Sequence, residues 1–305
     1  MTSSSPLGHV DSALAALLGS ALIRLQSVGG TADVICRVMT TDTRDNRCLV
    51  FLHIPKTAGQ TLHFVALRKF EPHETIHLNS LGKHIDDEME KIPRAARERA
   101  RLVWGNLPYG VHEHIPRPCE YLTILREPGS RVISVYKHIL NATSHVLHRR
   151  ITESRMGLEE YVESRIDAGQ TENSQTRQLS GRQFGSLERD ALEEARSHLQ
   201  RFLVVGVTER IEETFVLLRR SLGGGLMPYV TRNVSPSVDV TQRAVQLVRD
   251  RNELDIDLYT FAERLLTEQI RRQGRSFQAE VGFYRALRPA SRLAGRAADA
   301  VRGRR

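Results

Sequence analysis

The sequence has few of the residues that cross-link small folds or hold metal ions. Its three cysteines, Cys36, Cys48 and Cys119, show no paired spacing, so neither a disulfide framework nor a zinc site is expected. A reducing compartment is the default expectation, and the predicted location is cytoplasmic. Cys48 and Cys119 precede expected strands and are interpreted as inert packing residues.

Long apolar segments and internal repeats are also missing. The mild apolar patch ALAALLGSALI, residues 13–23, is too short to span a bilayer and follows no basic segment. A signal peptide is therefore not expected. A frayed or docking helix is the simpler interpretation of this patch.

Two common nucleotide-binding signatures are absent. No G-x-G-x-x-G follows an expected strand, which argues against a Rossmann dinucleotide site. The loop LHIPKTAGQT, residues 52–61, has Lys56 before Gly59, the reverse of the order G-x-x-x-x-G-K-[ST]. Two later strands run into Arg126 and Glu209 rather than into an aspartate that could hold Mg²⁺. A nucleotide kinase is therefore the weaker alternative.

The composition is that of a soluble globular protein with an anionic partner. The 305 residues are 40% hydrophobic and 26% charged, and the formal net charge is +8. This charge is compatible with a nucleotide, an acidic glycan, a membrane surface or nucleic acid. Nucleic acid is least favoured, because few aromatic residues are interleaved with the basic ones. Part of the charge belongs to the basic segment 273–305, which could make weak contact with an anionic membrane surface.

Apolar strand patterns alternate with helical patterns along the chain. The expected strands are 48–54, 101–104, 121–125 and 202–208, and the expected helices include those that follow Pro128, 209–222 and 240–272. This alternation predicts an α/β fold, a single domain with a central, mainly parallel sheet flanked by helices. The expected divisions are an N-terminal extension and linker, 1–47, a main domain, 48–272, and a basic tail, 273–305.

The loop 52–61 connects a strand to the start of a helix. Such a turn presents free backbone N–H groups and the positive end of a helix dipole to a small anion. Lys56 adds a full positive charge, and Thr57 and Thr61 add hydroxyl donors. The pattern predicts a phosphate-binding loop.

A second strand-to-helix junction begins at Arg126. Arg126 and Ser134 could hold a second phosphate, through a planar guanidinium and a neutral hydroxyl. Helical spacing places Ser130, Arg131, Ser134 and His138 on one face, and Val132, Tyr136 and Ile139 on the face toward the sheet. The alternative is a structural salt bridge between Arg126 and Glu127, with Ser134 as an ordinary surface residue.

These residues carry a resemblance to a known family. HIPKTAGQTL resembles the 5′-phosphosulfate-binding loop of carbohydrate sulfotransferases of the heparan-sulfate 2-O/6-O type and their bacterial relatives. ILREPGSRVISVYKH is similar to their 3′-phosphate segment, L-R-[DE]-P-x-x-R-x-x-S-x-Y. Four further segments fit in the same order, so the resemblance runs from about Cys48 to about Ile270: WGNLPYGVHEHIP, ENSQTRQLSG, VVGVTERIEETFVLL and RNELDIDLYTFAERLL.

The resemblance implies a fold related to P-loop nucleotide kinases and a donor, 3′-phosphoadenosine 5′-phosphosulfate (PAPS), with PAP as product. Lys56 would stabilise the leaving phosphate, and Arg126 and Ser134 would hold the 3′-phosphate. No metal would be required, because oriented N–H groups and a lysine can serve sulfuryl transfer. The acceptor would be a hydroxyl of a carbohydrate or glycolipid. The remaining contacts to the donor would come from the loop, mostly through backbone N–H groups: Thr57, Ala58, Gly59, Gln60 and Thr61.

The expected catalytic base departs from the family pattern. The family commonly has Gly-His where this chain has Gly105-Asn106, and asparagine cannot act as a base. Asn106 could orient the acceptor while His112 or Glu113, the favoured candidates, takes the proton. Otherwise His53, His84 or His114 could serve, catalysis could proceed slowly without a strong base, or the protein could be a catalytically silent PAPS-binding protein.

Two further segments are candidates for substrate contacts. Asn173 and Arg177, with Gln175 between them, form a polar cluster that could contact the acceptor or the adenosine. The segment containing Tyr229, Arg232 and Asn233 could close over the nucleotide as a lid. His145 and His148 have the spacing of a helical metal pair but lack a third ligand, so a surface position is the favoured interpretation.

Overall fold

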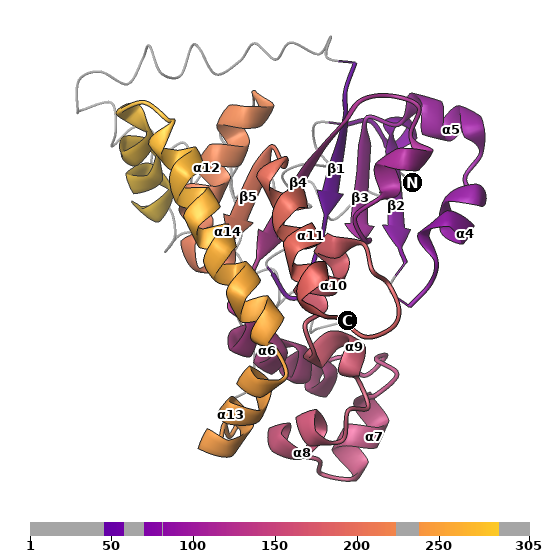
Figure 1. Cartoon of the computed structure of the whole chain (residues 1–305), viewed down its shortest axis with the longest axis vertical. Helices are drawn as coiled ribbons and strands as arrows, with labels where there is room; N and C mark the ends of the chain where they lie inside the picture. The colour runs from indigo at the N-terminus through magenta and orange to yellow at the C-terminus, as the bar shows by residue number, and fades with distance from the viewer. Residues whose placement is uncertain (1–45, 58–69, 81, 224–237, 287–305) are drawn as a thin grey trace, which may run out of the picture.

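The structure, a computed structural model, describes residues 46–57, 70–80, 82–223 and 238–286. Its centre is a five-stranded sheet in the order β2-β3-β1-β4-β5, in which every pairing is parallel (Figure 1). The strands are β1 Cys48–Leu52, β2 Thr75–Asn79, β3 Leu102–Asn106, β4 Cys119–Leu125 and β5 Val204–Val207. The predicted α/β fold with a parallel sheet is confirmed.

Strand β1, in the middle of the sheet, and strand β5, at one edge, are buried on both faces, which explains their continuous apolar sequences. All five residues of β1 and all four of β5 are buried. β2 lies at the edge of the sheet and alternates between buried and less buried positions. Its sequence, TIHLN, is polar at alternate positions, Thr75, His77 and Asn79. It therefore contains no apolar run, and the sequence predicts no strand there.

Helices α12 Ile211–Leu222 and α14 Glu253–Arg271 pack against β5 (Figure 1). Helices α10 Ser174–Ser180 and α11 Arg189–Gln200 pack against each other and against α14. The smaller helices α4 Ile85–Glu90 and α5 Arg94–Arg99 lie on the β2 side. Residues 276–286 are also helical, and Phe277, Val281 and Tyr284 are buried in the main core. The packed part of the chain therefore extends past the expected boundary at residue 272.

Helix α6, Pro128–Asn141, begins as expected with Pro128 in its first turn. The carboxylate of Glu127 accepts hydrogen bonds from the N–H groups of Gly129 and Ser130 at 2.8 and 2.6 Å, so it caps the helix. The predicted orientation of α6 is wrong. Val132, Tyr136 and Ile139 pack in a second apolar cluster with other helices, not against the sheet.

The second cluster joins α6 to α7 His148–Glu153, α8 Leu158–Glu163 and α13 Gln242–Asp250. These helices lie beyond the carboxyl ends of the strands, at the bottom of Figure 1. The expected single helix over 240–272 is divided into α13 and α14 at Arg251 and Asn252. The Asn252 side chain donates to the carbonyls of Val248 and Thr171, at 2.8 and 2.7 Å, and so fixes the corner between the two helices.

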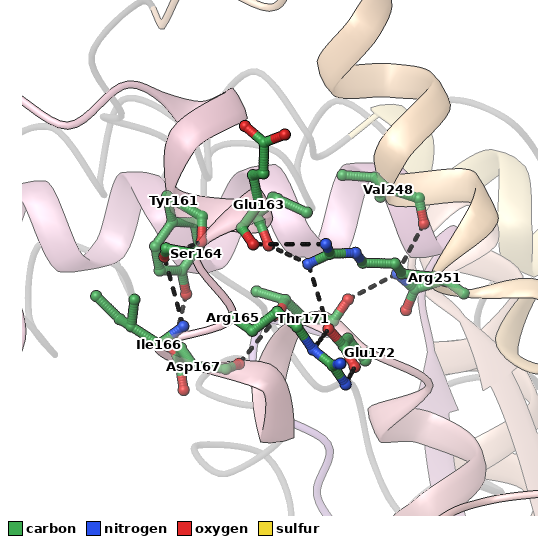
Figure 2. A network of polar contacts seen from close by, with 12 residues as sticks. Tyr161, Glu163, Ser164, Arg165, Ile166, Asp167, Thr171, Glu172, Val248 and Arg251 are labelled. Carbon is green, nitrogen blue, oxygen red and sulfur yellow. Dashed lines mark hydrogen bonds and ion pairs between the residues drawn. The ribbon is translucent and has the colours of Figure 1, made fainter.

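A polar network fastens this corner to the segment between α8 and α9 Ala168–Thr171 (Figure 2). Arg251 donates to the carbonyl of Val162 and contacts Glu172, which also forms a two-bonded ion pair with Arg165. Because α9 leads directly into α10, the network sets where α10 begins.

In the part of the chain that the structure describes, no helix is both long and apolar enough to cross a membrane.

Candidate functional site

The loop after β1 is held in a fixed shape by its own residues. β1 ends at Leu52, and Pro55 disfavours a helical backbone at the preceding Ile54. Lys56 has a positive φ of 72°, the left-handed region that a lysine rarely adopts. The buried Thr57 hydroxyl donates to the carbonyl of Ile54 at 2.8 Å, so it closes the turn. The other expected loop contacts, Ala58 to Thr61, lie outside the described residues.

Two arginines from the start of α6 hold this loop by its carbonyl groups. Arg126 Nη1 donates to the carbonyl of Lys56 at 3.1 Å, and Arg131 Nη1 donates to that of Pro55 at 3.4 Å. Arg131 also donates to the carbonyl of Gln170, so one fully buried side chain joins the loop to α9. The helical face that Arg131 was expected to share with Ser130, Ser134 and His138 is thus buried at this residue. The two predicted anion-binding segments form a single unit.

Helix α10 fixes both segments from the other side through two glutamine side chains. The amide of Gln175 accepts from the N–H of Arg126 and donates to its carbonyl, each at 2.9 Å. Gln178 Nε2 donates to the carbonyls of His53 and Leu107, both at 3.1 Å. The end of β4 and the end of β1 are thus held by one helix.

The start of α10 is fixed by a buried carboxylate. Asp255 accepts hydrogen bonds from the N–H groups of Gln175 and Thr176, at 3.1 and 2.7 Å, and from the Thr176 hydroxyl at 2.8 Å. Burial raises the pKa of Asp255, against the opposing effect of the Arg131 charge. Asn173 accepts from the N–H of Asp255 at 3.1 Å, so its amide oxygen serves this junction. Its role in substrate binding stays a prediction.

The site carries more positive charge than its own acids balance. Burial, and then the charge of Arg126, lowers the pKa of Lys56. Burial also lowers the pKa of Arg126, although Glu209 and Glu127 oppose the shift. Among the described residues, the buried Nε of Arg126 has no hydrogen-bond partner. An anion between the side chains of Lys56 and Arg126 would stabilise the charged forms of both.

Two polar residues, Ser134 and His138, follow along α6. Ser134 is half-buried there, and His138 follows one turn later and is exposed. The pKa of His138 is lowered by burial, by the charge of Lys56 and by His145. Lys56 and His138 therefore lie close enough to sense each other, and helical spacing places Ser134 on the same side of α6.

Asn106 and His53 are neighbours at the carboxyl edge of the sheet. The N–H of His53 donates to the carbonyl of Gly105 at 2.9 Å, one step beyond the pair Leu52 and Gly105. Gly105 has a φ of 137°, and a Cβ there would lie 1.9 Å from the carbonyl oxygen of Leu78, so only glycine fits. Alternation places both side chains on the face of Phe51, whose ring is 5.6 Å from that of His53.

The other predicted residues are placed elsewhere. His112 bonds to the hydroxyl of Tyr121, 2.9 Å from Nδ1, and Tyr121 pairs with Val50 in the middle of β1. The structure therefore does not bring His112 into the group around Lys56. Glu113, beside it, is exposed. Arg177 donates to the carbonyls of Arg182 and Gly185, at 3.3 and 3.0 Å, and so holds the loop after α10.

The residues that sequence reasoning missed are those that position the others. Gln178, Arg131 and Asp255 act through buried hydrogen bonds to backbone groups. Their sequence signal is weak: polar side chains within helical stretches that otherwise bury apolar residues. Among the residues that the structure describes, no group of three or more His, Cys, Asp or Glu could hold a metal ion.

Comparison with known proteins gives the family. A search of curated proteins finds no match for this chain. A sequence model described as the Sulfotransferase family matches residues 39–202, more than half of the chain. The matched region runs from before β1 to the end of α11 and contains Lys56, Arg126 and Asn106. With its parallel sheet and these two cationic segments at the carboxyl edge, the chain belongs to the sulfotransferase family.

Proposed function

We propose that the protein transfers a sulfuryl group from PAPS to a hydroxyl group of a carbohydrate or glycolipid. The observation that supports this most directly is the joined pair of cationic segments, in which Arg126 holds the carbonyl of Lys56 at 3.1 Å. Lys56 would lie beside the 5′-phosphosulfate, and Arg126 with Ser134 would hold the 3′-phosphate. Arg126 Nε, which has no hydrogen-bond partner among the described residues, would donate to this phosphate.

In the proposed reaction, the acceptor oxygen attacks sulfur while the bond from sulfur to the bridging 5′-phosphate oxygen breaks. Negative charge grows on that oxygen, and the ammonium of Lys56 stabilises it. Because Lys56 is partly desolvated, its interaction with an anion is stronger than that of a lysine in water. Gln175 and Gln178 keep the two strand ends from moving as this charge develops.

Binding of PAP, the desulfated donor, tests the donor site. Lys56→Ala and Arg126→Ala should each weaken PAP binding by about tenfold or more, about 1.4 kcal/mol, because each removes a desolvated cation beside a phosphate. Titration calorimetry measures the affinity. Arg201→Ala is the matched control, because this arginine bonds only to Ser197 on its own helix among the described residues. Unchanged affinity in both site variants would remove the basis of the proposal.

On the acceptor side, we propose His53 as the general base and Asn106 as the residue that orients the hydroxyl. His53 is the histidine that the register places beside Asn106, three residues before Lys56. A neutral imidazole suits proton removal near pH 7. The alternative, a catalytically silent PAPS-binding protein, is favoured by Asn106 itself, which stands where the family commonly has a histidine.

Transfer of labelled sulfate from PAPS to a panel of glycans tests this assignment. The wild type should label at least one glycan, and His53→Ala should lower kcat by about a hundredfold without changing PAP affinity. His112→Ala, the variant of the base favoured by sequence, should retain activity. If no glycan is labelled although PAP binds, the silent alternative holds. If His112→Ala is the inactive variant, the assignment to His53 is wrong while the sulfotransferase function stands.

A further inference from the structure

The first residues of β1 and β4 are a pair of cysteines that face each other across the sheet. The register pairs Cys48 with Cys119, and the N–H of Cys48 donates to the carbonyl of Pro118 at 2.9 Å. Neighbouring strands lie about 4.8 Å apart, and disulfides join Cα atoms separated by about 4.4–6.8 Å. Paired residues also point to the same face of a sheet, so the two side chains lie next to each other.

The two thiols have different surroundings. Cys48 is fully buried, whereas Cys119 is partly exposed. The neighbouring Cys48 side chain, together with the charge of Arg117, lowers the pKa of Cys119. The neighbouring Cys119 side chain and burial raise the pKa of Cys48. Cys119 is therefore the thiol that reacts first, because the thiolate is the nucleophile. Cys48 is the thiol that reacts in the second step.

We propose that Cys48 and Cys119 form a redox-active pair that a small-molecule disulfide oxidises to an intramolecular disulfide. The Cys119 thiolate attacks one sulfur of the small disulfide, whose S–S bond breaks and releases one thiolate. Cys48 then loses its proton and attacks the Cys119 sulfur, and the second small thiolate leaves. Two protein thiols are oxidised to one disulfide, and one small disulfide is reduced to two thiols.

The position of this pair decides what the bond would do. Cys48 and Cys119 begin the two strands whose other ends lead to Lys56 and Arg126. A bond at the starting edge would tie these two strands together without occupying the donor site at the opposite edge. Both residues are the first of their strands, where a small adjustment of the backbone disturbs little of the ladder. The proposal does not depend on the proposed reaction.

Treatment of the native protein with oxidised glutathione tests the pair. The Cys36→Ser variant should lose both remaining thiols, measured after denaturation, and peptide mapping should find Cys48 bonded to Cys119. Its Tm should rise on oxidation and return on reduction, with PAP affinity unchanged. The variant Cys36→Ser/Cys48→Ser should stop at a glutathione adduct on Cys119, whereas Cys36→Ser/Cys119→Ser should stay reduced.

Two results would overturn the proposal. One is a Cys36→Ser protein that keeps both thiols reduced. The other is a Cys36→Ser protein that accumulates the same glutathione adduct on Cys119 as the variant lacking Cys48, because Cys48 would then be unable to complete the bond. Both readouts are covalent and need no activity assay, and they remain valid if a serine variant is less stable than the wild type.

Discussion

The protonation of Lys56 depends on its surroundings. Burial and the nearby charge of Arg126 both disfavour its protonated form, so its pKa lies below the usual value of 10.5. A phosphate bound beside it favours the protonated form and raises that pKa again. Binding of an anion and binding of a proton are therefore linked at this side chain.

The expected consequence is a loss of PAP affinity as pH rises. Because its pKa is lowered, the ammonium group of Lys56 loses its proton, and hence its positive charge, at a lower pH than that of an ordinary lysine. Above that pH, PAP no longer has a cation beside its phosphate. Binding on the alkaline side should then take up protons, which titration calorimetry detects when buffers of different ionisation enthalpy are compared. Lys56→Arg, which stays charged, should abolish this proton uptake. An uptake that persists in Lys56→Arg would have to come from another group.

At the scale of elements, the sequence predicts the apolar strands better than the polar junctions. β1, β4 and β5 are recognisable because strands buried on both faces carry continuous apolar residues. β2 is missed, because it buries only alternate residues, Ile76 and Leu78. The break between α13 and α14 is also missed, since it depends on the Asn252 side chain and carbonyls distant in sequence.

One close contact between elements can be tested directly. A Cβ on Gly206 in β5 would lie 2.1 Å from the Cγ2 methyl of Thr214 in α12. Gly206→Ala should therefore destabilise the protein by about 1–3 kcal/mol, since the packed core cannot yield. Gly274→Ala is the matched control, because a Cβ there meets nothing within 4 Å. Urea denaturation measures both changes.

A second substitution checks the cause. Thr214→Ser removes the methyl group but keeps the hydroxyl, which donates to the carbonyl of Arg210 at 3.1 Å. Gly206→Ala should be partly rescued by Thr214→Ser. Equal stability of Gly206→Ala and the wild type would show that α12 can move away from the sheet.

At the scale of the whole molecule, the proposed donor site lies where two separately packed cores meet. One core surrounds the sheet, and the other joins α6, α7, α8 and α13 (Figure 1). Sequence motifs point to Lys56 and Arg126, because a charged residue soon after an apolar strand is conspicuous. They cannot identify Arg131 and Asp255 as the links between the cores, because helical periodicity does not show that Arg131 is fully buried.

The positive φ of Lys56 has a further consequence, for the balance between stability and activity. A lysine at a φ of 72° holds its backbone in a region that glycine adopts at little cost, and the difference is roughly 1 kcal/mol. Lys56→Gly should therefore unfold at a higher urea concentration than Lys56→Ala, although both variants lack the ammonium group and should bind PAP equally weakly. The chain retains at this position a residue that is unfavourable for folding, as expected where selection acts on chemistry rather than on stability.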